Sequence, residues 1–197
     1  MPQRQREPRP EPYHHGNLRR VILDAALDEI AERGAAAVSM RELARRAGVS
    51  HAAPAHHFGD KAGLLTAIAV EGYELLTVEL RRANERGGFA EVGLAYIAFA
   101  VENPAHFEVM YHPDLYRADD PAVLEARDAA GQLLYGPAEE AYPDRDAFRV
   151  GIAGWSFAHG FASLWTTGNL RHRLQGDPIE AARSIAEVLF RAPPRGS

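Results

Sequence analysis

The sequence predicts an all-α fold, with an N-terminal three-helix unit that contains a helix-turn-helix and a helical bundle after it. Apolar residues recur at spacings of three and four along most of the chain, as they do on the buried face of a helix. No stretch shows sustained alternation with a period of two, and glycines and prolines separate the periodic segments. The 197 residues, 46% hydrophobic and 25% charged, suit a soluble globular protein with a substantial core.

The N-terminal part is predicted to consist of a disordered tail followed by a first helix. Residues 1–12 are rich in proline and charge and lack an apolar period, so a disordered tail is expected there. A first helix is predicted from Asn17 to Gly34. Its apolar face comprises Leu18, Ile22, Ala25, Ala26, Ile30 and Ala31.

Two short helices joined by a tight turn are predicted over residues 39–58. Ser39 and Glu42 have the spacing of a capping box, and Gly48 stands where a helix ends in a left-handed residue. Val49 is expected to fill the core between the helices, and Ser50 to cap the second one. This arrangement is a helix-turn-helix, whose second helix fits the major groove of DNA.

The rest of the chain is predicted to be helical. Asp60 caps a helix that runs from Lys61 to about Glu85, and Gly87-Gly88 ends it. Further helices are expected at 89–103, at 104–110, at 121–142 with an interruption near Gly136-Pro137, at 144–168 and at 178–192, the last capped by Asp177-Pro178. The division is therefore a tail (1–12), a helix-turn-helix unit (13–61) and a helical body (62–192).

Composition excludes several kinds of chemistry. The chain has no cysteine, which rules out disulfides and thiolate nucleophiles. The nine histidines include two adjacent pairs, but neither pair has the i, i+4 spacing of a zinc site, so no metal and no other cofactor is expected. No apolar run approaches the ~20 residues of a membrane span, and no signal-peptide core is seen, so a cytoplasmic protein that does not enter the membrane is expected.

Charge favours the N-terminal part as a nucleic-acid contact. Residues 1–61 carry ten Lys or Arg against eight Asp or Glu, whereas the remainder carries twelve against nineteen. Within the helix-turn-helix, small side chains allow close approach to a base, a histidine can bond a base edge, and a cation at a helix start can meet a phosphate. The candidate DNA contacts are Ser39, Arg41, Ser50, His51, Ala52, Ala53, His56, His57 and Lys61.

Aromatic residues and Met gather in three separated segments, 96–99, 106–111 and 155–161. They are consistent either with core packing or with the walls of a small-molecule pocket that carries a few polar groups. Their few polar groups are mostly neutral, which favours an apolar or aromatic ligand. The candidate pocket residues are Tyr96, Phe99, His106, Phe107, Met110, Tyr111, Trp155 and His159. Glycines at 151, 154, 160 and 168 suit either a tight dimer interface or space for a ligand.

Several of these motifs resemble the N-terminal domain of TetR-type transcriptional repressors over about residues 16–66. They are Ala31-Glu-Arg-Gly34, Ser39-x-Arg-Glu-Leu-Ala-x-x-Ala-Gly-Val-Ser50, His57-Phe-Gly-Asp-Lys61 and Leu64-Leu65. The segments Glu102–Met110 and Trp155-Ser-Phe-Ala-His159-Gly160 resemble the subgroup whose regulatory domain carries a Trp…His-Gly signature. Ala55 and Pro54 depart from the family, which usually has Tyr and Leu there, so the DNA preference of relatives does not carry over.

The resemblance implies a homodimer that binds a palindromic operator in double-stranded DNA and is released by a small-molecule effector. The dimer interface is expected on the helices at 144–168 and 178–192, with Ile185 and Leu189 among its residues. Two other hypotheses stay open: a DNA-binding architectural protein without a ligand, and an enzyme that uses His159 with Asp146 or Glu108. No nucleophile motif, phosphate loop or metal spacing supports the enzyme, so no catalytic residue is predicted.

Overall fold

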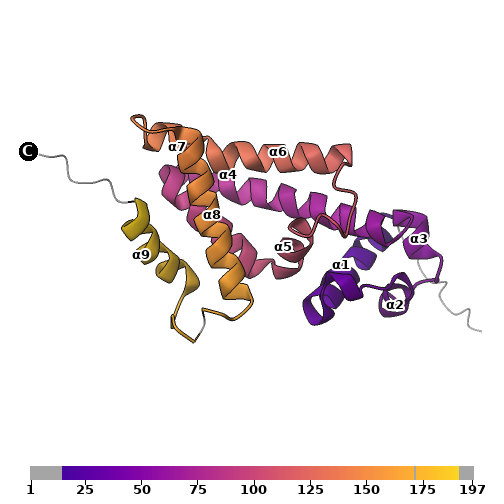
Figure 1. The fold of residues 1–197 in the computed structure, drawn as a ribbon. Coiled ribbons are helices and arrows are strands. Elements are labelled where there is room, and N and C mark those ends of the chain that lie inside the picture. Colours follow the sequence, from indigo (N-terminus) through magenta and orange to yellow (C-terminus); the bar gives the residue numbers. More distant parts are fainter. Residues whose placement is uncertain (1–14, 171, 191–197) are drawn as a thin grey trace, which may run out of the picture.

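The computed structural model describes residues 15–170 and 172–190, which confirm the all-α prediction: within them every regular element is a helix. The predicted tail at 1–12 lies outside the described residues. In chain order (Figure 1) the elements are α1 (His15–Arg33), η1 (Ala35–Ala37), α2 (Met40–Arg46), α3 (Ala53–Phe58), α4 (Lys61–Glu102), α5 (Pro104–Met110), α6 (Pro121–Tyr135), α7 (Pro137–Ala141), α8 (Ala147–Thr166) and α9 (Pro178–Phe190).

The long helix α4 connects the two ends of the molecule. Figure 1 shows α1, α2 and α3 gathered around its first turns and α6 lying along much of its length. α8 crosses α4, and α9 packs on α8 and α4 at the end remote from α3. α5 lies between α4 and α1, so this short helix contacts both halves of the fold.

The predicted break at Gly87-Gly88 is confirmed as a bend within α4. Gly88 has φ 66° and ψ −146°, a backbone conformation that residues with a Cβ avoid, and the residues on both sides of it are helical. The bend turns the segment 89–102 to face α8 and α9, and this orientation shapes the cavity described below.

One continuous hydrophobic core joins the two halves. Leu64, Leu65 and Ile68 of α4 are fully buried in the same cluster as Ile22 and Ile30 of α1. The cluster continues along α4 into the body, where Leu76, Leu80, Tyr96 and Phe99 are also buried. Of the predicted face of the first helix, Ala31 is an exception and lies exposed.

Aspartate caps were predicted correctly and serine caps were not. The carboxylate of Asp60 accepts the Gly63 amide at 2.8 Å, and that of Asp177 accepts the Glu180 amide at 3.0 Å. Ser39 occupies the N-cap position of α2 but makes no side-chain bond to the helix. The expected capping box does not form because Glu42 binds Arg45 and Arg46, which offer it charge-assisted hydrogen bonds.

Ser50 does not cap α3 either. The N-cap of that helix is Ala52, and the Ser50 main-chain oxygen accepts the Ala53 amide at 3.0 Å in the preceding turn. Among the described helices, none combines the length and the apolar character that a membrane crossing requires.

The left-handed turn at Gly48 provides a direct stability test. Gly48 has φ 65°, and open space surrounds the position that a Cβ would take. Gly48→Ala should therefore destabilise the fold through backbone strain alone, by about 1 kcal/mol in urea unfolding. Gly131→Ala is the matched control, because its Cβ would meet Tyr135 at an ordinary 3.5 Å within α6. It should be neutral or stabilising by up to about 1 kcal/mol, and equal losses for the two variants would contradict the turn assignment.

Candidate DNA-binding surface and effector cavity

The helix-turn-helix is built around the turn at Gly48. The Val49 amide donates to the Ala44 carbonyl at 3.0 Å, which folds the chain back after α2. Val49 is half-buried and packs on the core between the helices, as predicted. α3 packs in turn against α2, α1 and the start of α4, so its position relative to α4 is fixed by apolar contact.

The faces of α3 are clearly divided. Pro54 and Phe58 are buried. Ala53 is buried beside them, with only 9% of its surface exposed. Its methyl group packs in the core, so the prediction that Ala53 lies in a groove of DNA needs correction.

The outer side of the turn and of α3 carries histidines. His51 and His56 are exposed together with Ala52 and Ala55, and His57 is half-buried. The rings of His56 and His57 meet edge to face with their centroids 5.4 Å apart. Ser39 and Ser50 are exposed on the same two-helix unit.

Most cations near this surface are engaged within the protein. Arg46 binds Glu32 at 2.6 Å, and Arg45 binds Glu42, whose pKa the hydrogen bond from Arg45 lowers to about 2. Lys61 donates to the Ala36 carbonyl at 2.6 Å and so ties the start of α4 to η1.

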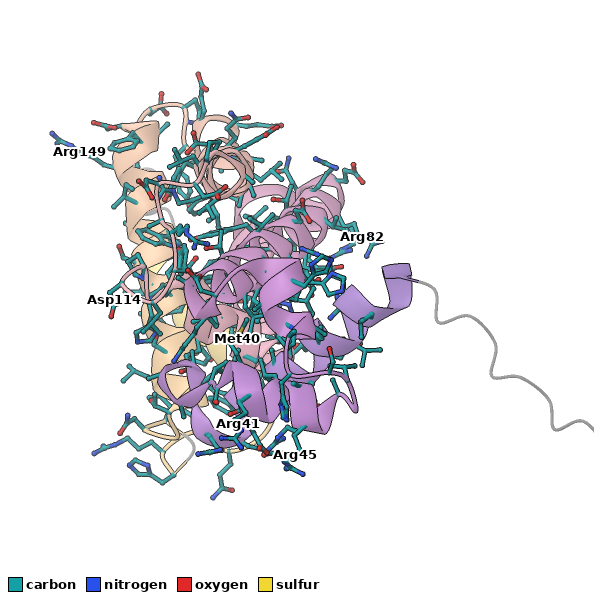
Figure 2. All side chains as sticks on the ribbon, turned by 90° about the vertical axis from the view of Figure 1, so that its right-hand side faces the viewer. Met40, Arg41, Arg45, Arg82, Asp114 and Arg149 are labelled. Atoms are coloured by element: carbon teal, nitrogen blue, oxygen red, sulfur yellow. The ribbon has the colours of Figure 1, made fainter. Side chains whose placement is uncertain are left out.

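Arg41 and Arg19 differ from these residues. Arg41 is exposed in the first turn of α2 and has no ion pair among the described residues. Figure 2 shows Arg41 and Arg45 on the end of the molecule formed by α2, away from Arg149. Sequence reasoning missed Arg19, whose guanidinium lies 5.2 Å from the centre of the Phe58 ring and next to the histidine surface.

Five of the predicted pocket residues meet in one aromatic cluster: Tyr96, Phe107, Tyr111, Trp155 and His159. Their ring centroids lie 4.5 to 6.4 Å apart. The Tyr96 hydroxyl and Nδ1 of His159 lie 2.9 Å apart. Burial lowers the pKa of His159 and raises that of Tyr111 to about 12, so both groups favour their neutral forms.

A cavity of about 500 Å³ lies beside this cluster, between the second half of α4, α8 and α9. Of the predicted pocket residues, only Trp155 lines it. The walls are mainly apolar, and Arg183 stands among them with its guanidinium 2.7 Å from Glu91. Other lining residues were not among the predicted pocket residues, and they include Phe89, Val92, Gly93, Leu94, Leu134, Tyr142, Phe157, Ala186 and Phe190.

Two glycines of α8 allow close packing within the chain, whereas the sequence left open a tight dimer interface or space for a ligand. A Cβ on Gly154 would come within 2.5 Å of the Phe89 ring, and one on Gly151 within 3.2 Å of the Tyr135 Cα. Both glycines therefore allow α8 to approach the body closely. Gly160 has open space at its Cβ position.

Three predicted pocket residues lie elsewhere. Phe99 and Met110 are buried in the main core, where the Met110 sulfur packs against Gly72. His106 faces α4 and α1, because its Nε2 lies 2.9 Å from Glu71, which also binds Arg20. Burial opposes the ionisation of Glu71, but the hydrogen bonds from His106 and Arg20 outweigh it and lower its pKa.

α5 also contacts the helix-turn-helix unit through Glu108. Its carboxylate accepts the Ala35 amide at 2.7 Å, at the start of η1. The same short helix contributes Phe107 to the aromatic cluster. α5 therefore touches the cluster with one side and the α1–η1 junction with another.

The outer faces of α8 and α9 leave apolar side chains exposed. Leu164 is 46% exposed, Leu189 56% and Val188 80%. Ile185, which is also predicted for the interface, is half-buried and packs partly on the core of its own chain.

Comparison with known proteins identifies both parts of the chain. Residues 22–68 match the family described as "Bacterial regulatory proteins, tetR family", and residues 89–189 match "Tetracyclin repressor-like, C-terminal domain". The HTH-type transcriptional regulator BetI of Agrobacterium fabrum is 42% identical over 185 residues, which cover 86% of this chain and 84% of that protein.

Solved structures show the same fold. A protein of unknown function from Rhodococcus sp. RHA1 superposes with a TM-score of 0.76 at 35% identity, over 92% of this chain and 97% of its own. The TetR-like regulator LfrR of Mycobacterium smegmatis, solved in complex with proflavine, superposes with a TM-score of 0.64 at 19% identity over 90% of this chain and 97% of its own. The matched families are transcription regulators. The chain belongs to the TetR family of bacterial regulatory proteins and is a DNA-binding transcriptional regulator.

Proposed function

We propose that the chain is a homodimeric repressor that binds a palindromic operator and leaves it when a small apolar or aromatic molecule enters the helical body. The apolar cavity between α4, α8 and α9 carries this proposal, because a body without space for a ligand would favour an architectural DNA-binding protein. The proposed division is a helix-turn-helix unit at 13–61 and a regulatory and dimerisation domain at 62–192.

The proposed DNA surface comprises the exposed residues of the helix-turn-helix. His51 and Ala52 in the turn before α3, and His56 and the half-buried His57 on α3, lie on its outer side, where they can enter the major groove. Ser39, Arg41 and Ser50 are exposed beside them and can meet phosphates. Lys61 can join them as well. Its ammonium carries three donors, and only one of them is used by the Ala36 carbonyl, so another can bind a phosphate.

The effector is proposed to occupy the cavity beside Trp155. Its apolar walls favour a ligand with little charge, and the pairing of Arg183 with Glu91 leaves no free cation there for a phosphate group. Trp155 also offers a buried indole N–H that lacks a hydrogen-bond partner within the described part of the chain, and a ligand could satisfy this donor. Trp155, His159 and Gly160 then correspond to the Trp…His-Gly signature of the subgroup that the sequence resembles.

The coupling between the two sites is proposed to run through α5. A ligand that displaces Trp155 would disturb the aromatic cluster and with it Phe107. A shift of α5 would move Glu108, which holds the Ala35 amide, and His106, which holds Glu71 and through it Arg20. Effector binding would thus favour a spacing of the two recognition helices that no longer matches grooves ~34 Å apart.

The phosphate contacts can be tested at Arg41. Arg41→Ala should weaken binding to operator and to random DNA together and lower the salt slope by about 1 per subunit, because a phosphate contact carries no sequence information. Fluorescence anisotropy titrations at several salt concentrations measure both quantities. Arg149→Ala is the control, since this exposed arginine lies at the other end of the molecule and should leave binding unchanged. A loss confined to the operator would contradict a phosphate role.

The dimer interface can be tested on α9. Replacing Val188 and Leu189 by Glu should give monomers at low micromolar concentration in sedimentation velocity, because it places charge in an apolar contact between subunits. The same replacement at Leu75 and Val78, exposed apolar residues of α4, should leave the dimer intact. Dimers that persist in the α9 variant would place the interface elsewhere.

The effector site can be tested by filling the cavity. Gly93 lines it and has open space at its Cβ position, so Gly93→Leu should occupy ligand volume without straining the core. Aromatic compounds that release the wild-type protein from DNA should act at least tenfold more weakly on this variant, with operator affinity unchanged within threefold. Ala122→Leu, at an exposed position of α6, is the control. Equal release of wild type and Gly93→Leu would exclude this cavity as the effector site.

A further inference from the structure

Within the described residues, the proposed DNA-facing end of the molecule has few cations outside ion pairs. Over residues 15–61, six carboxylates accompany seven Lys or Arg, so the fixed charge of this unit is close to zero. Most of these cations form ion pairs within the protein: Arg20 with Asp24 and Glu71, Arg33 with Glu29, Arg45 with Glu42, and Arg46 with Glu32. DNA is a polyanion, and neutralisation of its phosphates supplies most of the non-specific binding energy. A further source of positive charge on this surface would therefore strengthen DNA binding.

Histidine is the available source. His51, His56 and His57 lie together on the outer side of the recognition helix and the turn before it. An imidazole is the side chain whose charge ordinarily changes between pH 5 and 8, and a nearby negative charge favours its protonated form. Three such groups would raise the charge of each subunit's DNA-facing surface by up to three when phosphates approach.

The charged neighbours of α3 lie on the three helices packed against it, α1, α2 and α4. On α1 they are Arg19, above Phe58, and the Arg20–Asp24 pair. On α2 they are Arg41 and Glu42 with its partners Arg45 and Arg46. At the start of α4 they are Lys61 and Asp60, and Asp60 binds Arg117 and the Gly63 amide. Within the described residues, no acid forms a hydrogen bond or ion pair with His51, His56 or His57.

We propose that DNA binding by this protein is coupled to proton uptake by His51, His56 and His57, so that the complex strengthens as pH falls from 8 to 6. The inference rests on the proposed DNA surface and adds its regulation: the histidines act as titratable phosphate and base contacts in place of arginine or lysine. A group that gains a full proton on binding strengthens the complex by up to about tenfold for each unit by which the pH falls.

The test uses the full-length protein and two fluorescein-labelled duplexes of equal length. One is selected from a random-sequence pool by the purified protein at pH 7, and the other is unselected. Dissociation constants are measured by anisotropy at pH 6, 7 and 8 at fixed ionic strength. Wild-type protein should bind both duplexes at least tenfold more tightly at pH 6 than at pH 8, and the salt slope should be steeper at pH 6 because more charges meet phosphates.

Glutamine variants identify the groups that titrate. His51→Gln with His56→Gln and His57→Gln keeps polar side chains but removes the titratable rings, and its affinity should change less than threefold over the same range. The double variant at His51 and His56 spares the half-buried His57 and should lose more than half of the pH response on a logarithmic scale. His172→Gln is the matched control, an exposed histidine in the α8–α9 connection, and should behave as wild type.

The outcomes separate the inference from the proposed function. Binding that is tight but independent of pH, or a pH response that survives in the triple variant, would overturn proton coupling and leave the DNA surface standing. Absence of DNA binding at every pH by folded wild-type protein would instead overturn the proposed DNA surface itself.

Discussion

The shared hydrophobic core along α4 is the constraint on which the rest of the structure depends. Leu64, Leu65 and Ile68 pack with α1 at one end of this helix, while Tyr96 and Phe99 are buried in the body at the other. Protein interiors are close-packed, so the two halves cannot move independently without opening gaps along α4. The same packing that stabilises the fold therefore links the DNA-facing end to the cavity.

Polar contacts also connect α5 to the helix-turn-helix unit. Between α5 and the helix-turn-helix unit, the Glu108 carboxylate holds the Ala35 amide, and the His106–Glu71–Arg20 chain joins three helices. Such bonds are half-buried and geometrically specific, so a small displacement of α5 is transmitted rather than absorbed. The aromatic cluster on the other side of α5 is adjustable by comparison, because edge-to-face rings tolerate a range of offsets. A ligand beside Trp155 would act on this adjustable side.

Contacts within the protein also determine which charges of the helix-turn-helix remain available. The arginines that look available for DNA in the sequence are mostly paired with carboxylates of the protein itself, and the Arg46–Glu32 bridge joins α2 to α1 in this way. Exposed ion pairs of this kind stabilise the fold little, typically by less than about 1 kcal/mol. They nevertheless orient the arginines and reduce their free charge, which leaves Arg41, Arg19 and the three histidines as the groups best placed to meet a polyanion.

The sequence by itself determined the helices, the turn at Gly48, the bend at Gly88 and the family, because each is encoded locally by apolar period, aspartate caps and glycines in left-handed conformations. The tertiary structure decided which partner each side chain contacts. Glu42 binds the guanidinium of Arg45 instead of capping α2, Ala53 is buried in the core, and His106 contacts Glu71 instead of lining a pocket. The position of the cavity was equally beyond the sequence. It lies between α4, α8 and α9, beside the bend at Gly88 and the contact of Gly154 with Phe89, and the spacing of these helices depends on how whole helices pack.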